Sequence, residues 1–73
     1  IYPNPVGNSA SVSIESEQVV SVEAINTLSQ KFQLSFEKMI TKLEINTSNL
    51  PAGLYNLHIK AIKKEFIVKF IKM

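Results

Sequence analysis

Hydrophobic and polar residues alternate along most of this chain in short runs, and turn-forming residues separate these runs. Between residues 10 and 14, alanine, valine and isoleucine alternate with serine. A period of two places one set of side chains on a buried face and the other on a solvated face, as in a half-buried β-strand. Prolines, asparagines and a glycine occupy all of residues 3–8 except Val6, and we expect a stiff connector there after a short edge strand that ends at Ile1 and Tyr2.

The same alternation predicts five more strands. Val20, Val22 and Ala24 share the predicted buried face of a strand over residues 19–25, after a polar turn at 15–18. A loop over residues 46–53 is expected to be anchored by Leu50. Such short strands between turns describe an all-β sandwich. The remaining strands are predicted at residues 32–36, 43–45, 55–59 and 66–70.

The C-terminal segment also fits a second pattern, that of a basic amphipathic helix. From residue 59 onward, apolar residues recur every three or four positions among lysines, as in helices that dock on a membrane surface or in a partner groove. Against the helix, Ile67 and Ile71 would lie among the lysines. Residues 66–71 are also mostly β-branched or aromatic, types that suit strands. We therefore favour the strand.

Length and composition describe a small domain with few routes to chemistry. The chain has 73 residues, is 45% hydrophobic and carries a net charge of +2, which is too mild to imply nucleic acid. No apolar run approaches the ~20 residues of a membrane span. Cysteine is absent, which excludes disulfides and thiolate metal sites. Because the chain opens without methionine, we expect residues 1–73 to be one domain cut from the end of a larger secreted protein.

Candidate catalytic residues are scarce. A general base needs an orienting partner and a nucleophile, and the alternation instead places His58 on the solvent face of a strand. Glu15 and Glu17 resemble a solvated strand end more than a catalytic pair. One histidine with scattered glutamates does not supply a metal site. Residues 46–48 match the glycosylation sequon, a match that is common by chance. We expect no enzyme activity, no cofactor and no metal.

Residues 50–55, with the sequence Leu-Pro-Ala-Gly-Leu-Tyr, form the most informative local string. Pro51 sets φ at the first corner of a tight turn, and Gly53 can take a positive φ near the second corner. Tyr55 then begins a strand, and we expect its ring to pack inside while its hydroxyl reaches a backbone group. A good turn that leads into a core strand explains these residues, and a rigid turn also makes a good recognition edge.

The last strand is rich in lysine. Five of the eight lysines lie within residues 60–73, where they are expected to solvate one face and to discourage aggregation through the strand edge. If Phe70 faces the core, Ile67 and Ile71 point outward beside Lys69 and form a candidate docking surface. We favour the simpler explanation that neighbouring strands cover both sides of this strand.

Three strings, taken in order, resemble the C-terminal sorting domain of the type IX (Por) secretion system of Bacteroidetes, type A family. They are residues 2–5 (Tyr-Pro-Asn-Pro), residues 50–55 and residues 69–72 (Lys-Phe-Ile-Lys). Residues 20–31 also match the second block of that family. Two positions depart from its pattern, since Ser29 stands where glycine is usual and Ile25 where an aromatic is common. The resemblance covers essentially the whole chain.

The resemblance implies an immunoglobulin-like β-sandwich of about seven strands that acts as an address rather than as a catalyst. Such domains end secreted enzymes and adhesins that pass through the periplasm to the cell surface or the medium. They are recognised by the outer-membrane translocon and its shuttle barrel protein, and a sortase typically removes them at a site that we expect upstream of residue 1. The resemblance assigns recognition to the turn and to residues 69–72, and the strand pattern adds the outward Ile67. The predicted partner-recognition residues are therefore Pro51, Gly53, Tyr55, Ile67, Lys69, Phe70, Ile71 and Lys72.

A passive β-sandwich spacer or binding module of a cell-surface protein is the alternative function. Sugar-binding modules usually present a platform of exposed aromatic side chains, whereas this chain has no tryptophan and its strand aromatics fall on predicted core faces. That pattern weighs against sugar binding but leaves a structural spacer open. In either case, no nucleic-acid partner and no direct membrane insertion are expected.

Overall fold

The computed structural model describes residues 5–14 and 18–73, which form seven strands and, within these ranges, no helix. The strand predicted for residues 66–70 is therefore confirmed over the helical alternative. The predictions for the edge strand at Ile1 and Tyr2, for most of the turn at 15–18 and for Glu15 and Glu17 lie outside the described residues. The strands are β1 (Ser9–Ser13), β2 (Val19–Asn26), β3 (Lys31–Gln33), β4 (Phe36–Lys38), β5 (Lys42–Asn46), β6 (Gly53–Ala61) and β7 (Glu65–Lys72).

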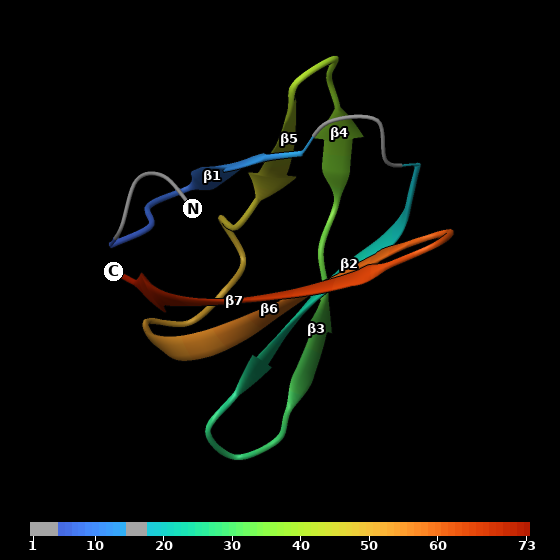
Figure 1. Cartoon of the computed structure of the whole chain (residues 1–73). Coiled ribbons are helices and arrows are strands. Elements are labelled where there is room, and N and C mark those ends of the chain that lie inside the picture. The colour runs from blue at the N-terminus through green and yellow to red at the C-terminus, as the bar shows by residue number, and fades with distance from the viewer. Residues whose placement is uncertain (1–4, 15–17) are drawn as a thin grey trace.

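Two antiparallel sheets make up the molecule (Figure 1). One has the order β1-β5-β4, and the other has the order β3-β2-β6-β7. This grouping corresponds to the B-E-D and C′-C-F-G strands of immunoglobulin-like sandwiches. The predicted all-β, immunoglobulin-like sandwich of about seven short strands is confirmed.

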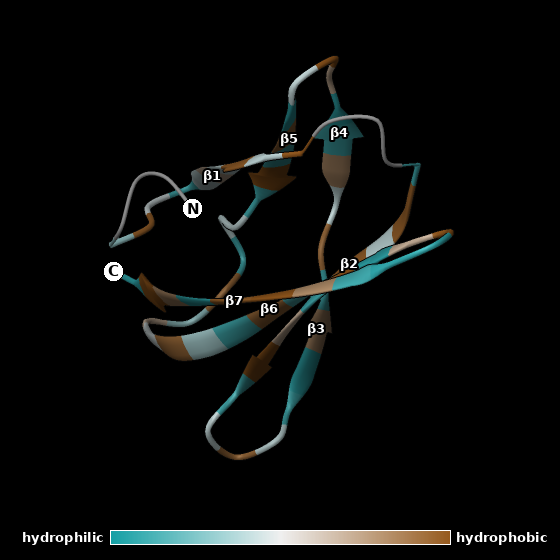
Figure 2. Cartoon of the chain, in the orientation of Figure 1, coloured by the Kyte–Doolittle hydropathy of each residue, from teal (hydrophilic) through white to brown (hydrophobic). Residues whose placement is uncertain are grey.

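The core lies between the sheets and takes alternate residues from both. Figure 2 shows the alternation of hydrophobic and hydrophilic residues along β6 that produces it. Leu57 and Ile59 of β6 face Leu43 and Ile45 of the other sheet, and all four are at most 1% exposed. Leu50 is buried as predicted and anchors the loop before β6. The hydrophobic effect on these residues is the main stabilising contribution to the fold.

The face predicted for Val20 is wrong, because β2 contains an irregularity. Val19 pairs with Ala61 while Ser21 pairs with Lys60, so one extra residue is inserted between these two pairs. Such a bulge reverses the faces of the residues before it. Val20 is 62% exposed, and Val19 packs against the core in its place.

The single strand predicted for residues 32–36 is also wrong, because the chain changes sheets there. The Leu34 N–H still donates to the Val22 carbonyl in one sheet, at 3.0 Å. One residue later, the Ser35 carbonyl accepts from the Asn46 N–H of the other sheet, at 2.9 Å. The alternation of apolar residues continues through this crossing because both sheets face the same core, so the sequence pattern gives no sign of the change.

The turn between β2 and β3 forms although serine replaces the family's usual glycine. Ser29 has a φ of 64°, in the left-handed region that glycine adopts most easily. Asn26 organises the turn, since its side-chain Oδ1 accepts hydrogen bonds from the N–H groups of Leu28 and Gln30, both at 2.9 Å. Serine thus adopts the left-handed conformation in this turn, at the cost of backbone strain at Ser29.

Candidate recognition surface

The Pro51–Gly53 turn is locked by Tyr55, the third residue of β6. The Tyr55 hydroxyl donates a hydrogen bond to the Pro51 carbonyl at 2.6 Å. Gly53 has a φ of 154°, which L side chains rarely adopt, although a Cβ built there would meet no atom closer than 4.0 Å. The backbone conformation, rather than crowding, therefore requires glycine here. The prediction that the tyrosine hydroxyl reaches a backbone group is confirmed.

The tyrosine ring is part of the core. Tyr55 is 3% exposed, stacks on Phe70 with ring centroids 5.4 Å apart, and meets Phe32 edge-on at 6.0 Å. Burial raises the pKa of the Tyr55 hydroxyl, so it stays protonated and able to donate at neutral pH. A tyrosine at the start of this strand that bonds back to the preceding loop is the tyrosine corner of immunoglobulin-like domains.

The two informative strings meet in space. In the antiparallel pairing of β6 with β7, Gly53 lies opposite Lys72 and Tyr55 lies opposite Phe70. The turn predicted at residues 50–55 and the last strand therefore form one end of a single hairpin. The spacing along the sequence does not reveal this pairing, because it depends on the register of two strands that are joined by a short loop.

The predicted recognition residues of the last strand separate onto two faces. Ile67, Lys69 and Ile71 are exposed, with 61% of Ile67 and 48% of Ile71 accessible to solvent. Phe70 and Lys72 point inward, and they are 1% and 7% exposed. Phe70 can thus act on a partner through packing rather than by direct contact. The favoured explanation, that neighbouring strands cover both sides of β7, is wrong at Ile67 and Ile71 because both side chains remain exposed.

Leu54 is an exposed residue that the sequence analysis missed. It lies opposite Ile71 and is 49% exposed. We call the outward side chains of Leu54, Ile67, Lys69 and Ile71 the outer hairpin face. The alternation in β6 was the available signal, since a residue next to the buried Tyr55 must point outward. A depression of about 130 Å³ lies beside Leu54 and Lys69.

The last residues of β7 are also held from their other side, by Val6. The Val6 N–H donates to the Ile71 carbonyl at 2.6 Å, and the Met73 N–H donates to the Val6 carbonyl at 2.9 Å. These bonds form a parallel bridge between Val6 and Lys72, and the Val6 side chain is completely buried. The connector that enters the domain thus lies directly against the strand that ends it.

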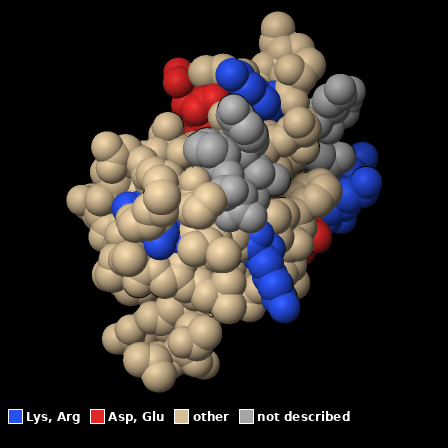
Figure 3. Space-filling model, turned by 90° about the vertical axis from the view of Figure 1, so that its left-hand side faces the viewer, with Lys and Arg blue, Asp and Glu red and all other residues tan. Residues whose placement is uncertain are grey.

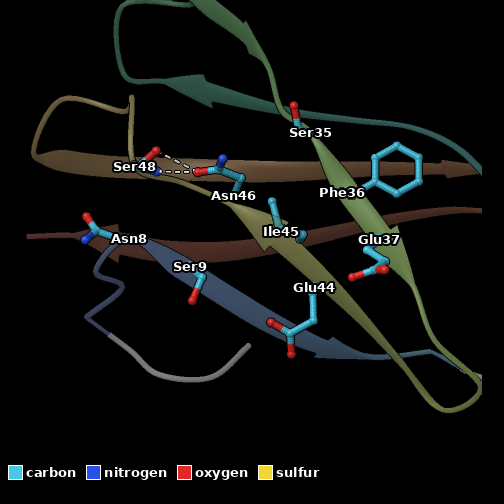
Figure 4. A pocket seen from close by; sticks show the side chains of 9 residues that line it. All are labelled: Asn8, Ser9, Ser35, Phe36, Glu37, Glu44, Ile45, Asn46 and Ser48. Carbon is cyan, nitrogen blue, oxygen red and sulfur yellow. Dashed lines mark hydrogen bonds between the residues drawn. The ribbon is translucent and has the colours of Figure 1, made fainter.

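A shallow groove of about 440 Å³ lies on the other sheet, where Phe36 and Ile45 line it together with polar side chains (Figure 4). Glu44 accepts a hydrogen bond from the Ser11 hydroxyl at 2.6 Å and lies 3.2 Å from the ammonium of Lys42. The Ser11 hydrogen bond, followed by Lys42, holds the pKa of Glu44 below its ordinary value. In the described ranges, no three side chains of metal-ligand type come together.

Charge is spread thinly over the molecule. On the face shown in Figure 3, a few lysines and glutamates are scattered among uncharged residues. His58 is partly buried and lies 3.8 Å from Glu65 across the hairpin, which agrees with a histidine at the rim of a strand. Within residues 5–14 and 18–73, no helix has the length and hydrophobicity that are needed to span a membrane.

Fold and surface together define a class of protein: a small immunoglobulin-like module whose tyrosine corner supports an exposed terminal hairpin. A family model described as a secretion system C-terminal sorting domain matches residues 1–73, the whole chain. The chain therefore belongs to the family of type IX secretion C-terminal sorting domains. Comparison with curated proteins and with solved structures gave no significant match.

Family membership gives the general role of the chain. It is a sorting signal for type IX secretion, which implies an interaction with the type IX machinery and export to the cell surface or secretion. The resemblance predicted from the three strings is thereby confirmed. The family is one of sorting signals rather than of enzymes.

Proposed function

We propose that residues 1–73 are a folded address at the end of a secreted cargo protein. The outer-membrane translocon and its shuttle barrel protein recognise this address after the cargo has entered the periplasm. A sortase then removes the domain at a site upstream of residue 1, and the cargo is released or stays at the cell surface.

The pairing of β6 with β7 is the observation that carries this proposal. It joins Gly53 and Tyr55 to the last strand, and the Tyr55 hydroxyl holds Pro51, so that the two family strings form one continuous structure. The buried and the exposed residues of the hairpin have different proposed roles. Gly53, Tyr55 and Phe70 maintain the conformation of the hairpin, and the outer hairpin face, which includes Ile71, contacts the machinery.

Apolar side chains around a lysine suit a protein partner. Leu54 and Ile71 are cross-strand neighbours, and each leaves about half of its surface in water, so a partner that covers both gains hydrophobic contact. Lys69 lies opposite Asn56, next to this pair, and can bond to acceptors on the partner. Lysine at this place also disfavours nonspecific pairing between copies.

The edge of β7 offers a second mode of contact. β7 is the last strand in the order of its sheet, and Val6 bridges to it at Lys72. A partner strand can add to such an edge through backbone hydrogen bonds, which tolerate differences in sequence between domains. This mode suits a machinery that receives many different cargos.

A transplant tests the function. Residues 1–73 are fused to the C-terminus of a periplasmic fluorescent protein in a Bacteroidetes host with a working type IX system, and fluorescence is measured in the periplasm, at the surface and in the medium. We expect the fusion to leave the periplasm, and to remain there in a host whose translocon is disabled. Retention in both hosts would favour the passive spacer and overturn the proposal.

A truncation tests the terminal strand separately. Removal of residues 69–73 deletes Lys69 and Ile71 from the outer hairpin face, and we expect it to abolish export. Because Phe70 leaves with them, the folded state of the truncated fusion is checked by circular dichroism. Export that continues without these residues would show that residues 69–73 play no part in recognition.

A further inference from the structure

A row of outward side chains crosses the sheet that contains the outer hairpin face. Lys31 of β3 lies opposite Ile25 of β2, which in turn lies opposite Asn56 of β6. Asn56 pairs with Lys69 of β7, the lysine of the outer hairpin face. Both lysines are exposed, whereas the two residues between them are half-buried. We call these four side chains the cross-sheet row, and it extends the outer hairpin face to the opposite edge of the sheet.

The two lysines that end the row are free to meet an acidic partner. In the described part of the chain, neither Lys31 nor Lys69 takes part in an ion pair. Glu23 of β2 lies in the next row, where its carboxylate accepts a hydrogen bond from the Gln33 side-chain amide at 3.1 Å. Two ammonium groups on one face attract the carboxylates of a partner and steer its approach.

The depression of about 130 Å³ opens beside the middle of the row. Three members of the row line it together with residues of the tyrosine corner and of the end of β2, among them Ile25, Asn26, Leu54, Tyr55, Asn56 and Lys69. Small-molecule pockets measure about 300–1,000 Å³, so the depression suits one side chain of a partner. Hydrogen bonds hold its walls in place, from the Tyr55 hydroxyl to the Pro51 carbonyl and from the Leu28 N–H to the Asn26 side chain. Such a preorganised wall loses little conformational entropy on binding.

The spacing of the row fits an extended polypeptide. Lys31 and Lys69 are separated by three strand spacings, which is about 14 Å between their backbones. Residues four apart in an extended chain are separated by about 13–14 Å, and they face the same side as the residue midway between them. A segment that runs across the strands therefore matches both lysines and the depression with alternate side chains.

We propose that the cross-sheet row binds an extended acidic segment of the secretion machinery, with two carboxylates four residues apart on Lys31 and Lys69 and an apolar side chain between them in the depression. The inference rests on the proposed function, because it gives the chemistry of the partner that meets the outer hairpin face. The depression favours a polypeptide over an anionic lipid surface, since it receives one side chain at a fixed place.

Charge reversal at Lys31 tests the row at the edge farthest from β7. Lys31→Glu changes an exposed side chain without an ion pair in the described residues, so the Tm of the purified fusion should stay close to that of the natural fusion. Export of the fluorescent cargo should fall at least about tenfold, because a carboxylate would face the carboxylates of the partner. Lys31→Arg keeps the charge and should keep export. Lys63→Glu makes the same change in the loop between β6 and β7 and should also be exported normally.

Lys69→Glu, at the other end of the row, should lower export as strongly and keeps the test independent of the stability of β3. Export of both reversed variants at the level of Lys63→Glu would overturn the acidic segment and leave the proposed function intact. A loss with Lys31→Arg as large as with Lys31→Glu would show that charge is not what the partner reads, and would also overturn it. Failure of the natural fusion to be exported would instead overturn the proposed function.

Vesicles distinguish the two classes of partner. The purified natural fusion is mixed with vesicles of phosphatidylcholine alone and with vesicles that also contain phosphatidylglycerol, and sedimentation measures the bound fraction. We expect the same bound fraction with both compositions. Binding to the anionic vesicles that Lys31→Glu abolishes would assign the row to a lipid surface and overturn the proposal of an acidic segment.

Discussion

The tyrosine corner makes a quantitative prediction for Tyr55→Phe. The substitution removes the hydroxyl that donates to the Pro51 carbonyl at 2.6 Å, and it keeps the ring that stacks on Phe70 and meets Phe32. An intramolecular hydrogen bond of this kind contributes about 0.5–1.5 kcal/mol net. Pro51 is exposed, so water can bond to its carbonyl after the change, and we expect a loss of about 1 kcal/mol.

Thermal unfolding of the isolated domain measures this loss. For a domain of this size, about 1 kcal/mol corresponds to a fall in Tm of roughly 4–8 °C. Tyr55→Leu is the matched control, because it also removes the ring and its contacts with Phe70 and should cost more. An unchanged Tm for Tyr55→Phe would refute the stabilising role of the hydrogen bond. Loss of export by a folded Tyr55→Phe domain would refute the view that Tyr55 acts through the fold.

The pH dependence of stability provides an independent check on Tyr55. Burial raises the pKa of its hydroxyl above the ordinary value of 10.0, so the folded state binds this proton more tightly than the unfolded state does. The resulting stabilisation is complete below about pH 10 and is lost as the pH rises through the folded-state pKa. We therefore expect the difference in stability between the natural domain and Tyr55→Phe to shrink at alkaline pH. A constant difference would contradict the burial of an intact hydroxyl.

Three further predictions concern the turns and the contacts of Glu44. Ser29→Gly should stabilise the domain by about 1 kcal/mol in denaturant unfolding because it relieves the left-handed φ, and a gain for Ser29→Ala would contradict this explanation. Gly53→Ala should destabilise the domain by about 1–3 kcal/mol, whereas Gly7→Ala, where a Cβ meets no atom within 4 Å, should change little; equal effects would refute the role of φ. The lowered pKa of Glu44 contributes stability that is present above its ordinary value of 4.5 and is lost as the pH falls through the folded-state value. Glu44→Gln should therefore flatten the acid limb of the stability curve, and an unchanged limb would show that the Ser11 contact is unimportant.

The sequence predicts the strands of this fold well where one face is dry and the other wet. β1, β5, β6 and β7 follow strict alternation, and their buried residues are those that the period of two selects. The errors occur where the period survives a change in structure. At Val20, an inserted residue reverses the faces, and at Leu34 the chain moves between sheets that share one core.

The recognition surface could be predicted in part. Burial of the tyrosine and exposure of Ile67 and Ile71 follow from the pattern, and the role of the Tyr55 hydroxyl follows from its place beside a Pro-Gly turn. Pairing of residues 50–55 with the last strand depends on strand register, and the parallel bridge from Val6 depends on the closure of the whole sandwich. Alternation within a strand contains neither piece of information, because it fixes the face of each side chain but not the register of a hairpin, and the Val6 bridge joins distant parts of the chain.

Export of cargo by variants of the outer hairpin face tests the central claim most directly. Ile67→Ser and Ile71→Ser replace side chains that are 61% and 48% exposed, and Ile40→Ser replaces an isoleucine that is 90% exposed in the loop between β4 and β5. We predict that both hairpin variants keep a Tm close to that of the natural domain and lower export, while Ile40→Ser changes neither quantity. Full export by a domain that carries both hairpin substitutions, or a loss of export by Ile40→Ser as large as theirs, would contradict recognition through this face.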